Sequence, residues 1–102
     1  MDEITTIEKL TGNIIEYREQ EKLDQLDNIQ TLIQAINVES AELLETITFK
    51  NTINKKQIKQ GLADVLIYCF ALADLMYLDV EDIITDKIHY NKQRNRKYLN
   101  HE

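Results

Sequence analysis

The chain has 102 residues, no proline and only two glycines, Gly12 and Gly61. Because these two residue types are the strongest breakers of helices, their scarcity favours an all-α chain. The net charge of -6 argues against non-specific nucleic-acid binding by the whole domain, since affinity for phosphate backbones comes largely from clustered Lys and Arg. A divalent cation is a more suitable ligand for a chain with this negative charge than a nucleic acid is.

The length predicts one helical domain over residues 1–102. A chain this short buries a smaller share of its surface than a larger protein, so we expect an oligomer. Cys69 lies in the apolar run 65–73 and has no partner for an intrachain disulfide. No basic segment followed by an apolar stretch opens the chain, and its longest uncharged apolar run is far shorter than a membrane span. We therefore expect a cytoplasmic protein without membrane contact.

The first predicted helix covers residues 2–20, where apolar side chains at spacings of three and four form one stripe: Ile4, Ile7, Leu10, Ile14 and Tyr17. A polar segment follows over residues 21–27. Asp27 or Asn28 can cap the second helix, which runs to about residue 50. Turn-forming residues at 51–54 end this helix.

The third predicted helix spans residues 55–77, and its middle is apolar on every side, which is typical of a helix buried in a bundle. Asp79 has the position of a cap for the fourth helix, residues 80–97. That helix ends in cations, the sign its dipole favours there: Lys92, Arg94, Arg96 and Lys97. The four helices with short connections predict an all-α, four-helix bundle that oligomerisation completes.

Three acidic residues of the second and third helices are candidate metal ligands. Glu39 and Glu42 are three residues apart and so share one helix face. If a turn at 51–54 folds the two helices antiparallel, Glu42 lies about 12 Å and Asp64 about 15 Å from the turn, at about 1.5 Å per residue. Carboxylates that converge beside an apolar helix need a compensating charge, and hard oxygen ligands favour Mg²⁺, Mn²⁺ or Ca²⁺. The alternatives are a solvated Glu pair and a salt-bridged structural Asp64.

A second hairpin, between the third and fourth helices, would bring nitrogen donors to the same place. Folding about residues 78–79 puts Lys87, Asn91 and Arg94 alongside Tyr68 and Asp64. The three donors recur at i, i+4 and i+7 and form one stripe that could hold the oxygens of a polyphosphate. The alternative is a basic helix end that complements the dipole.

These segments resemble the all-α nucleoside triphosphate pyrophosphohydrolases, the MazG-like and dCTP pyrophosphatase-type proteins. Residues 37–45 (NVESAELLE) are similar to the first acidic motif of that superfamily. Residues 62–68 (LADVLIY) and 71–74 (ALAD) resemble the second motif and the helix that follows it. Residues 78–84 (LDVEDII) and the donors at 87, 91 and 94 continue the match in register, so the resemblance covers nearly the whole chain.

The resemblance implies Mg²⁺, or Mn²⁺ in its place, held by four acids. Glu39, Glu42 and Asp64 match three of them, whereas Gly61 stands where the family has the fourth, a glutamate. Antiparallel register pairs position 45 with position 61, so Glu45 is a candidate to replace that ligand or to activate the attacking water. By resemblance, phosphates would be contacted by Tyr68, Lys87, Asn91 and Arg94. Family members also pair helices across subunits, which implies a homodimer or a dimer of dimers.

In the dCTP pyrophosphatase type, two tryptophans and a histidine cradle the base. The matching positions here are Leu23, Phe49 and Ile14, of which only Phe49 is aromatic. A cytosine preference therefore does not transfer. Phe49 could stack on a base or serve as a core aromatic.

The predicted activity is Mg²⁺-dependent hydrolysis of a nucleoside triphosphate to monophosphate and pyrophosphate, with nucleotide-pool house-cleaning as a possible role. The first alternative is a regulatory homologue that binds nucleotide but is impaired by Gly61. The second is a helical interaction module whose basic tail, with Tyr90 and Tyr98, contacts RNA or an acidic partner.

Overall fold

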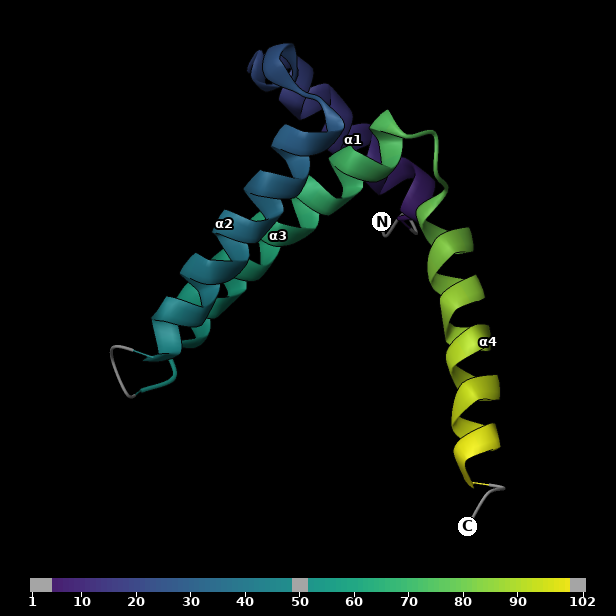
Figure 1. Ribbon diagram of the computed structural model, residues 1–102. Coiled ribbons are helices and arrows are strands. Elements are labelled where there is room, and N and C mark those ends of the chain that lie inside the picture. Colours follow the sequence, from purple (N-terminus) through teal and green to yellow (C-terminus); the bar gives the residue numbers. More distant parts are fainter. Residues whose placement is uncertain (1–4, 49–51, 100–102) are drawn as a thin grey trace.

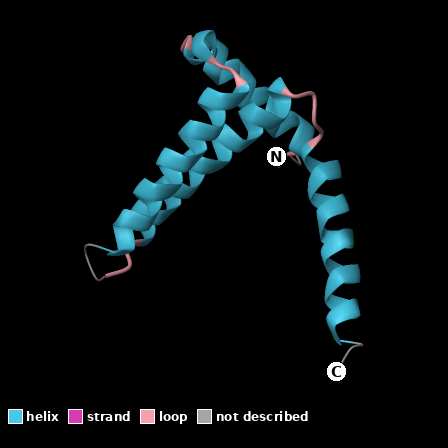
Figure 2. Ribbon diagram, in the orientation of Figure 1, coloured by secondary structure: helices cyan, strands magenta, loops and turns pink. Residues whose placement is uncertain are grey.

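The computed structural model describes residues 5–48 and 52–99, which form four α-helices and one short 3₁₀ helix (Figures 1 and 2). The α-helices are α1 (Ile7–Gln20), α2 (Ile29–Thr48), α3 (Lys55–Leu75) and α4 (Val80–Leu99), and the 3₁₀ helix is η1 (Leu23–Leu26). No strand occurs in these two ranges, so the prediction of an all-α chain is confirmed.

Side-chain caps fix where the helices begin. In each case an oxygen accepts the backbone N–H three residues later, at distances of 2.8–3.1 Å, and the capping residues are Thr6, Asn28, Asn54 and Asp79. Of the two residues predicted to cap the second helix, Asn28 is the one that does so, and Asp79 caps the fourth as predicted. The predicted start of the first helix at residue 2 is too early, because Thr6 is its extended N-cap; residues 2–4 lie outside the described ranges.

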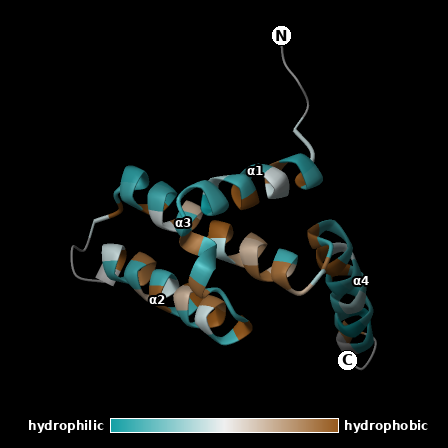
Figure 3. Ribbon diagram, turned by 90° about the horizontal axis from the view of Figure 1, so that it is seen from above, coloured by the Kyte–Doolittle hydropathy of each residue, from teal (hydrophilic) through white to brown (hydrophobic). Residues whose placement is uncertain are grey.

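The helices α2 and α3 run antiparallel, and α3 lies between α2 and α1 (Figures 1 and 3). Leu32 of α2 is almost completely buried, and Ala71 and Ala73 of α3 are buried too. Small residues at these positions let the neighbouring helices approach α3 closely. The hairpin predicted from the turn residues near 51–54 is therefore present.

A buried ion pair fastens α1 to the segment that leads into α2. Arg18 is 5% exposed, and its two terminal nitrogens donate to the two Asp27 carboxylate oxygens at 2.7 and 3.1 Å. The guanidinium carbon also lies 5.4 Å from the ring centroid of Tyr68 on α3. A planar guanidinium can make a bidentate bond and stack on an aromatic face at once. Arg18 thus connects three elements through one side chain.

The helix α4 leaves the hairpin instead of folding back along α3, and the two helices are bent by 101° (Figure 1). The corner is a left-handed C-terminal motif: Tyr77 has φ 56°, and the N–H groups of Tyr77 and Leu78 donate to the Asp74 and Ala73 carbonyls at 3.0 and 2.8 Å. These bonds end α3 at Leu75, two residues before the predicted end, and redirect the chain. The predicted packing of the fourth helix against the third is therefore wrong for a single chain.

One copy of the chain is extended, and much of its apolar surface is exposed to solvent. Its radius of gyration is 17.0 Å, whereas a compact domain of this length has about 13 Å. Apolar side chains on the hairpin remain about half exposed, including Ile33 (51%), Leu62 (47%) and Leu66 (48%). The middle of α3 was predicted to be buried on every side, but α4 does not cover it.

Within the described residues, no helix alone combines the length and the apolar character needed to cross a membrane. Helices α3 and α4 meet that test only together, as a bent pair, and by length and composition alone.

Replacing Arg18 by Ala should lower the free energy of unfolding by about 3 kcal/mol, because it leaves the carboxylate of Asp27, 18% exposed, without its partner. Urea unfolding at a fixed protein concentration measures this change. The control is Arg96→Ala on the exposed face of α4, for which we expect a change within about 0.5 kcal/mol. Equal effects of the two substitutions would contradict a structural role for the Arg18–Asp27 pair.

Candidate functional site

Three carboxylates lie around one cavity between α2 and α3. Glu39 and Glu42 come from α2 and Asp64 from α3, and the cavity has a volume of about 250 Å³. Its other lining residues are Leu43, Thr46, Gln57, Gln60 and Gly61. The antiparallel hairpin therefore brings together the three acids that the sequence singled out.

The three acids influence one another electrostatically. The pKa of Glu39 is raised above its ordinary value of 4.5, first because burial disfavours its charged form. The charges of Glu42 and then Asp64 raise this pKa further, as does a side-chain hydrogen bond with Glu42. Such a cluster gains most from a cation, which offsets both the burial and the repulsion.

The donor set fits a hard divalent cation, since it consists of carboxylate and carboxamide oxygens. Among the described residues, no three Asp, Glu, His or Cys side chains already converge closely enough to hold an ion. The acids share a cavity without meeting at one point. Gln57 contributes a further feature, because its Oε1 atom is buried and has no hydrogen-bond partner.

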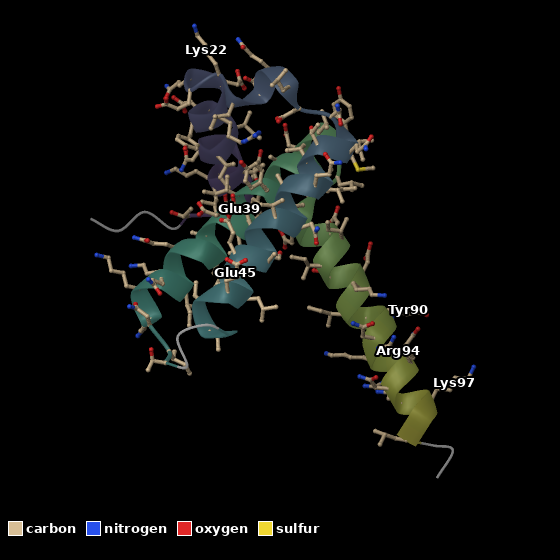
Figure 4. All side chains as sticks on the ribbon, turned by 60° about the vertical axis from the view of Figure 1, so that its left-hand side comes forward. Lys22, Glu39, Glu45, Tyr90, Arg94 and Lys97 are labelled. Carbon is tan, nitrogen blue, oxygen red and sulfur yellow. The ribbon has the colours of Figure 1, made fainter. Side chains whose placement is uncertain are left out.

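Gly61 lies on the wall of the same cavity, opposite Leu43. A Cβ atom on residue 61 would lie 3.0 Å from Leu43 Cδ1 and 3.8 Å from its Cα. The residue that faces position 61 is thus Leu43 and not Glu45, which corrects the register inferred from the sequence. Glu45 is exposed and is not among the residues that line the cavity (Figure 4). This placement does not support Glu45 as a replacement for the fourth acid.

Tyr68 follows Asp64 by one turn of α3 and is the residue on which Arg18 stacks. Arg18 was not among the residues singled out from the sequence, whereas the neighbouring Tyr17, which is 49% exposed, was assigned to the apolar stripe. The only available signal was a pair of opposite charges at positions 18 and 27, on either side of a polar segment. Sequence spacing alone does not pair residues across such a turn.

The predicted nitrogen donors lie on α4, away from the acids of the same chain. Figure 4 shows Glu39 on the hairpin and Arg94 on the separate helix. Lys87 Nζ lies 4.5 Å from the ring centroid of Tyr90, and Lys87 and Arg94 are exposed, whereas Asn91 is partly buried. None of these three donors lines the acid cavity of its own chain.

The positions matched to a base pocket are not gathered around the acids either. Ile14 is a partly buried residue of α1, and Leu23 of η1 is 46% exposed. Neither residue lines the acid cavity. Phe49 lies outside the described residues.

The model of the MazG-like family matches residues 11–101, which include the acid cavity, the α3–α4 corner and α4. No curated protein matches the chain.

Replacing Glu39 by Gln should raise the melting temperature of the metal-free protein at pH 7. A folded-state pKa raised above the unfolded value means that the folded state binds more protons, so this group lowers stability as pH rises above about 4.5. The advantage of the variant should therefore shrink as the pH falls from 7.5 towards 4.5. Thermal unfolding in EDTA across this range measures it.

The matched control for that experiment is Glu45→Gln, which removes an exposed carboxylate from the same helix. Its effect on melting temperature should be smaller at pH 7. A melting temperature lowered by Glu39→Gln at pH 7 would show that the ionised carboxylate is stabilised in the metal-free fold, contrary to the expected sign.

Proposed function

The chain belongs to the MazG-like family, and on this basis we propose that it is a Mg²⁺-dependent nucleoside triphosphate pyrophosphohydrolase. It would convert a ribo- or deoxyribonucleoside triphosphate and water into the monophosphate and pyrophosphate. The observation that carries the proposal is the placement of Glu39, Glu42 and Asp64 around one cavity. The family match supports this type of activity, and the acids supply the donors that it requires.

In this proposal Glu39, Glu42 and Asp64 hold the metal, with Mn²⁺ as a possible substitute. A bound divalent cation would neutralise negative charge that develops on the pyrophosphate leaving group. The proposed ligands come from two helices that pack against each other, so this packing would fix the position of the metal and, through it, of the triphosphate. Tyr68, on whose ring Arg18 stacks, follows Asp64 by one helical turn and would offer its hydroxyl group to a phosphate from outside the acid cavity.

We further propose that Lys87, Asn91 and Arg94 reach the acid cavity from a second copy of the chain. Helix α4 diverges from its own hairpin, so its donors and acids are separated within one copy (Figure 4). The large radius of gyration and the half-exposed Ile33, Leu62 and Leu66 support association through the hairpin. A homodimer or a dimer of dimers would then unite the two halves of the site and bury this apolar surface.

A second candidate is a regulator that binds nucleotide without hydrolysing it. The observation that favours this candidate is Gly61, which stands where the family has its fourth acid and against which Leu43 packs so closely that a Cβ would lie 3.0 Å from Leu43 Cδ1. Metal affinity with three carboxylates would then suffice for binding but not for turnover. Both candidates use the same cavity, so one set of measurements distinguishes them.

Pyrophosphate release from a panel of ribo- and deoxyribonucleoside triphosphates with Mg²⁺ tests the enzyme. We expect turnover with at least one triphosphate and a loss of about a hundredfold or more in Glu42→Gln, because a metal ligand is removed. The control is Asp86→Asn, an exposed acid of α4, which should keep wild-type turnover. Thermal stabilisation by nucleotide and Mg²⁺ without pyrophosphate release would instead support the regulator.

Mixing two inactive variants tests the shared site. Glu42→Gln damages the acid half and Arg94→Ala the donor half, so a mixed dimer would contain one intact site of two. With random exchange, half of the dimers are mixed, and activity should return to about a quarter of the wild-type value. If the mixture stays inactive although subunits exchange, the acids and donors of a site do not come from different copies.

A further inference from the structure

A groove of about 770 Å³ runs between α1 and the corner that joins α3 to α4, and it shares no lining residue with the acid cavity. We call it the α1 groove. Its apolar side chains are Ile7, Ile15, Leu78 and Val80. Gly12 also lines it, and a Cβ atom at this position would meet no atom of another described element within 4 Å. No other described part of the chain therefore packs on α1 at this point, and the groove is open to an outside partner.

The charge of the α1 groove is of one sign. Its charged lining residues are all acidic and exposed: Glu8, Glu16, Glu19, Asp74, Asp79 and Glu81. Among the described residues, no Lys, Arg or His lines it. Carboxylates that lie along one groove repel each other, so a cationic occupant gains from all of them at once. The apolar side chains between the acids suit a helix better than a small ion.

The far half of α4 has the opposite charge. After Asp86, the described part of this helix has no acidic residue. Lys92 and Arg96 are both exposed and lie four residues apart, so they share one helix face, which we call the basic face. Arg96 follows Lys87 by about two and a half helical turns and therefore lies on the opposite side of α4. The basic face is thus distinct from the stripe of proposed phosphate donors.

The basic face cannot enter the α1 groove of its own chain. The helix α4 begins at the groove, because Val80 and Glu81 line it, and it continues without interruption to Leu99. Arg96 therefore lies about 22 Å along the helix from Glu81, at about 1.5 Å per residue. Figure 4 shows the neighbouring Lys97 at the far end of α4. Since α4 makes little contact with the other helices of its chain, its basic face is available to a second copy.

The positions of the two charged surfaces are compatible with a two-fold axis. The groove lies at the beginning of α4 and the basic face lies near its end. If two copies place their α4 helices side by side and antiparallel, the end of each helix reaches the beginning of the other. Both contacts then form together, and the pair is closed. Charge complementarity of this kind favours one orientation of the two chains over others.

We propose that the α1 groove of one copy receives the basic face of α4 from a second copy, in a two-fold pair with antiparallel α4 helices. Lys92 and Arg96 would lie against the groove acids of α1, among them Glu16 and Glu19. The donor stripe on the opposite side of α4 remains free for an acid cavity. This contact is therefore a second interface, and with association through the hairpin it would complete a dimer of dimers.

Size-exclusion chromatography with light scattering tests the interface through the mass of the assembly. A single exposed ion pair contributes little, so two charges are reversed at once. Lys92→Glu/Arg96→Glu should reduce the mass to about half of the wild-type value, because a two-fold contact is lost. Glu16→Lys/Glu19→Lys should do the same from the other side. A chain with all four reversals exchanges the two charges and should regain the wild-type mass.

The matched control is Lys55→Glu/Lys59→Glu, an exposed pair with the same spacing on α3 that lines neither the groove nor the acid cavity. It should keep the wild-type mass. Circular dichroism checks that each variant is helical, and if Glu16→Lys/Glu19→Lys does not fold, the neutral Glu16→Gln/Glu19→Gln should still lower the mass. The wild-type mass should also fall when the salt concentration rises from about 0.1 M to about 0.5 M, because salt screens exposed charges.

An unchanged mass in Lys92→Glu/Arg96→Glu would overturn the proposal. So would a loss in this variant alone, or a fourfold reversal that stays at half mass, because the basic face would then bind elsewhere. If the mass is unchanged but binding of labelled single-stranded RNA is lost, the basic face serves RNA and the proposal is wrong. Pyrophosphate release per chain is a separate measurement: its absence in the wild type would contradict the proposed function and leave the mass comparison valid.

Discussion

When two antiparallel helices pack through their apolar faces, the packing also fixes the relative positions of the polar residues at the edges of these faces. In this protein the contact is that of α2 with α3, and at Gly61 the helices are so close that a Cβ would lie 3.0 Å from Leu43 Cδ1. The separation of the two backbones here determines how far Glu39 and Glu42 lie from Asp64. The cavity lined by acids is therefore a consequence of helix packing. Its negative charges lie on α2 and α3, which their packing holds together.

Local sequence signals predicted much of this arrangement. Caps at Asn28 and Asp79, the turn near 51–54 and the helical periodicity depend on neighbouring residues, so they could be recognised from the chain alone. The placement of Glu39, Glu42 and Asp64 around one cavity followed from their distances to the turn. Such distances give the position of a residue along the helix axis but not the rotation of the helix about that axis. For this reason Glu45 was paired with position 61 in place of Leu43.

The course of α4 could not be predicted in the same way. Its direction depends on the left-handed conformation of Tyr77, a residue type that rarely adopts it and gives no sequence signal for it. The role of Arg18 was hidden for another reason, because its partners Asp27 and Tyr68 come from other elements and meet only in the folded chain. Long-range contacts and strained backbone are the two features that periodicity does not encode.

The direction of α4 depends on the corner at Tyr77, so a small rotation there moves the far end of the helix by a larger distance. From Val80 to Arg94 the helix extends about 21 Å, so a rotation of about 10° at the corner would displace Arg94 by about 4 Å, more than the length of a hydrogen bond. The side chain of Tyr77 is 97% exposed, so packing within its own chain does little to fix this angle. Substitutions at the corner would therefore change the position of the proposed phosphate donors of α4 without altering the donors themselves.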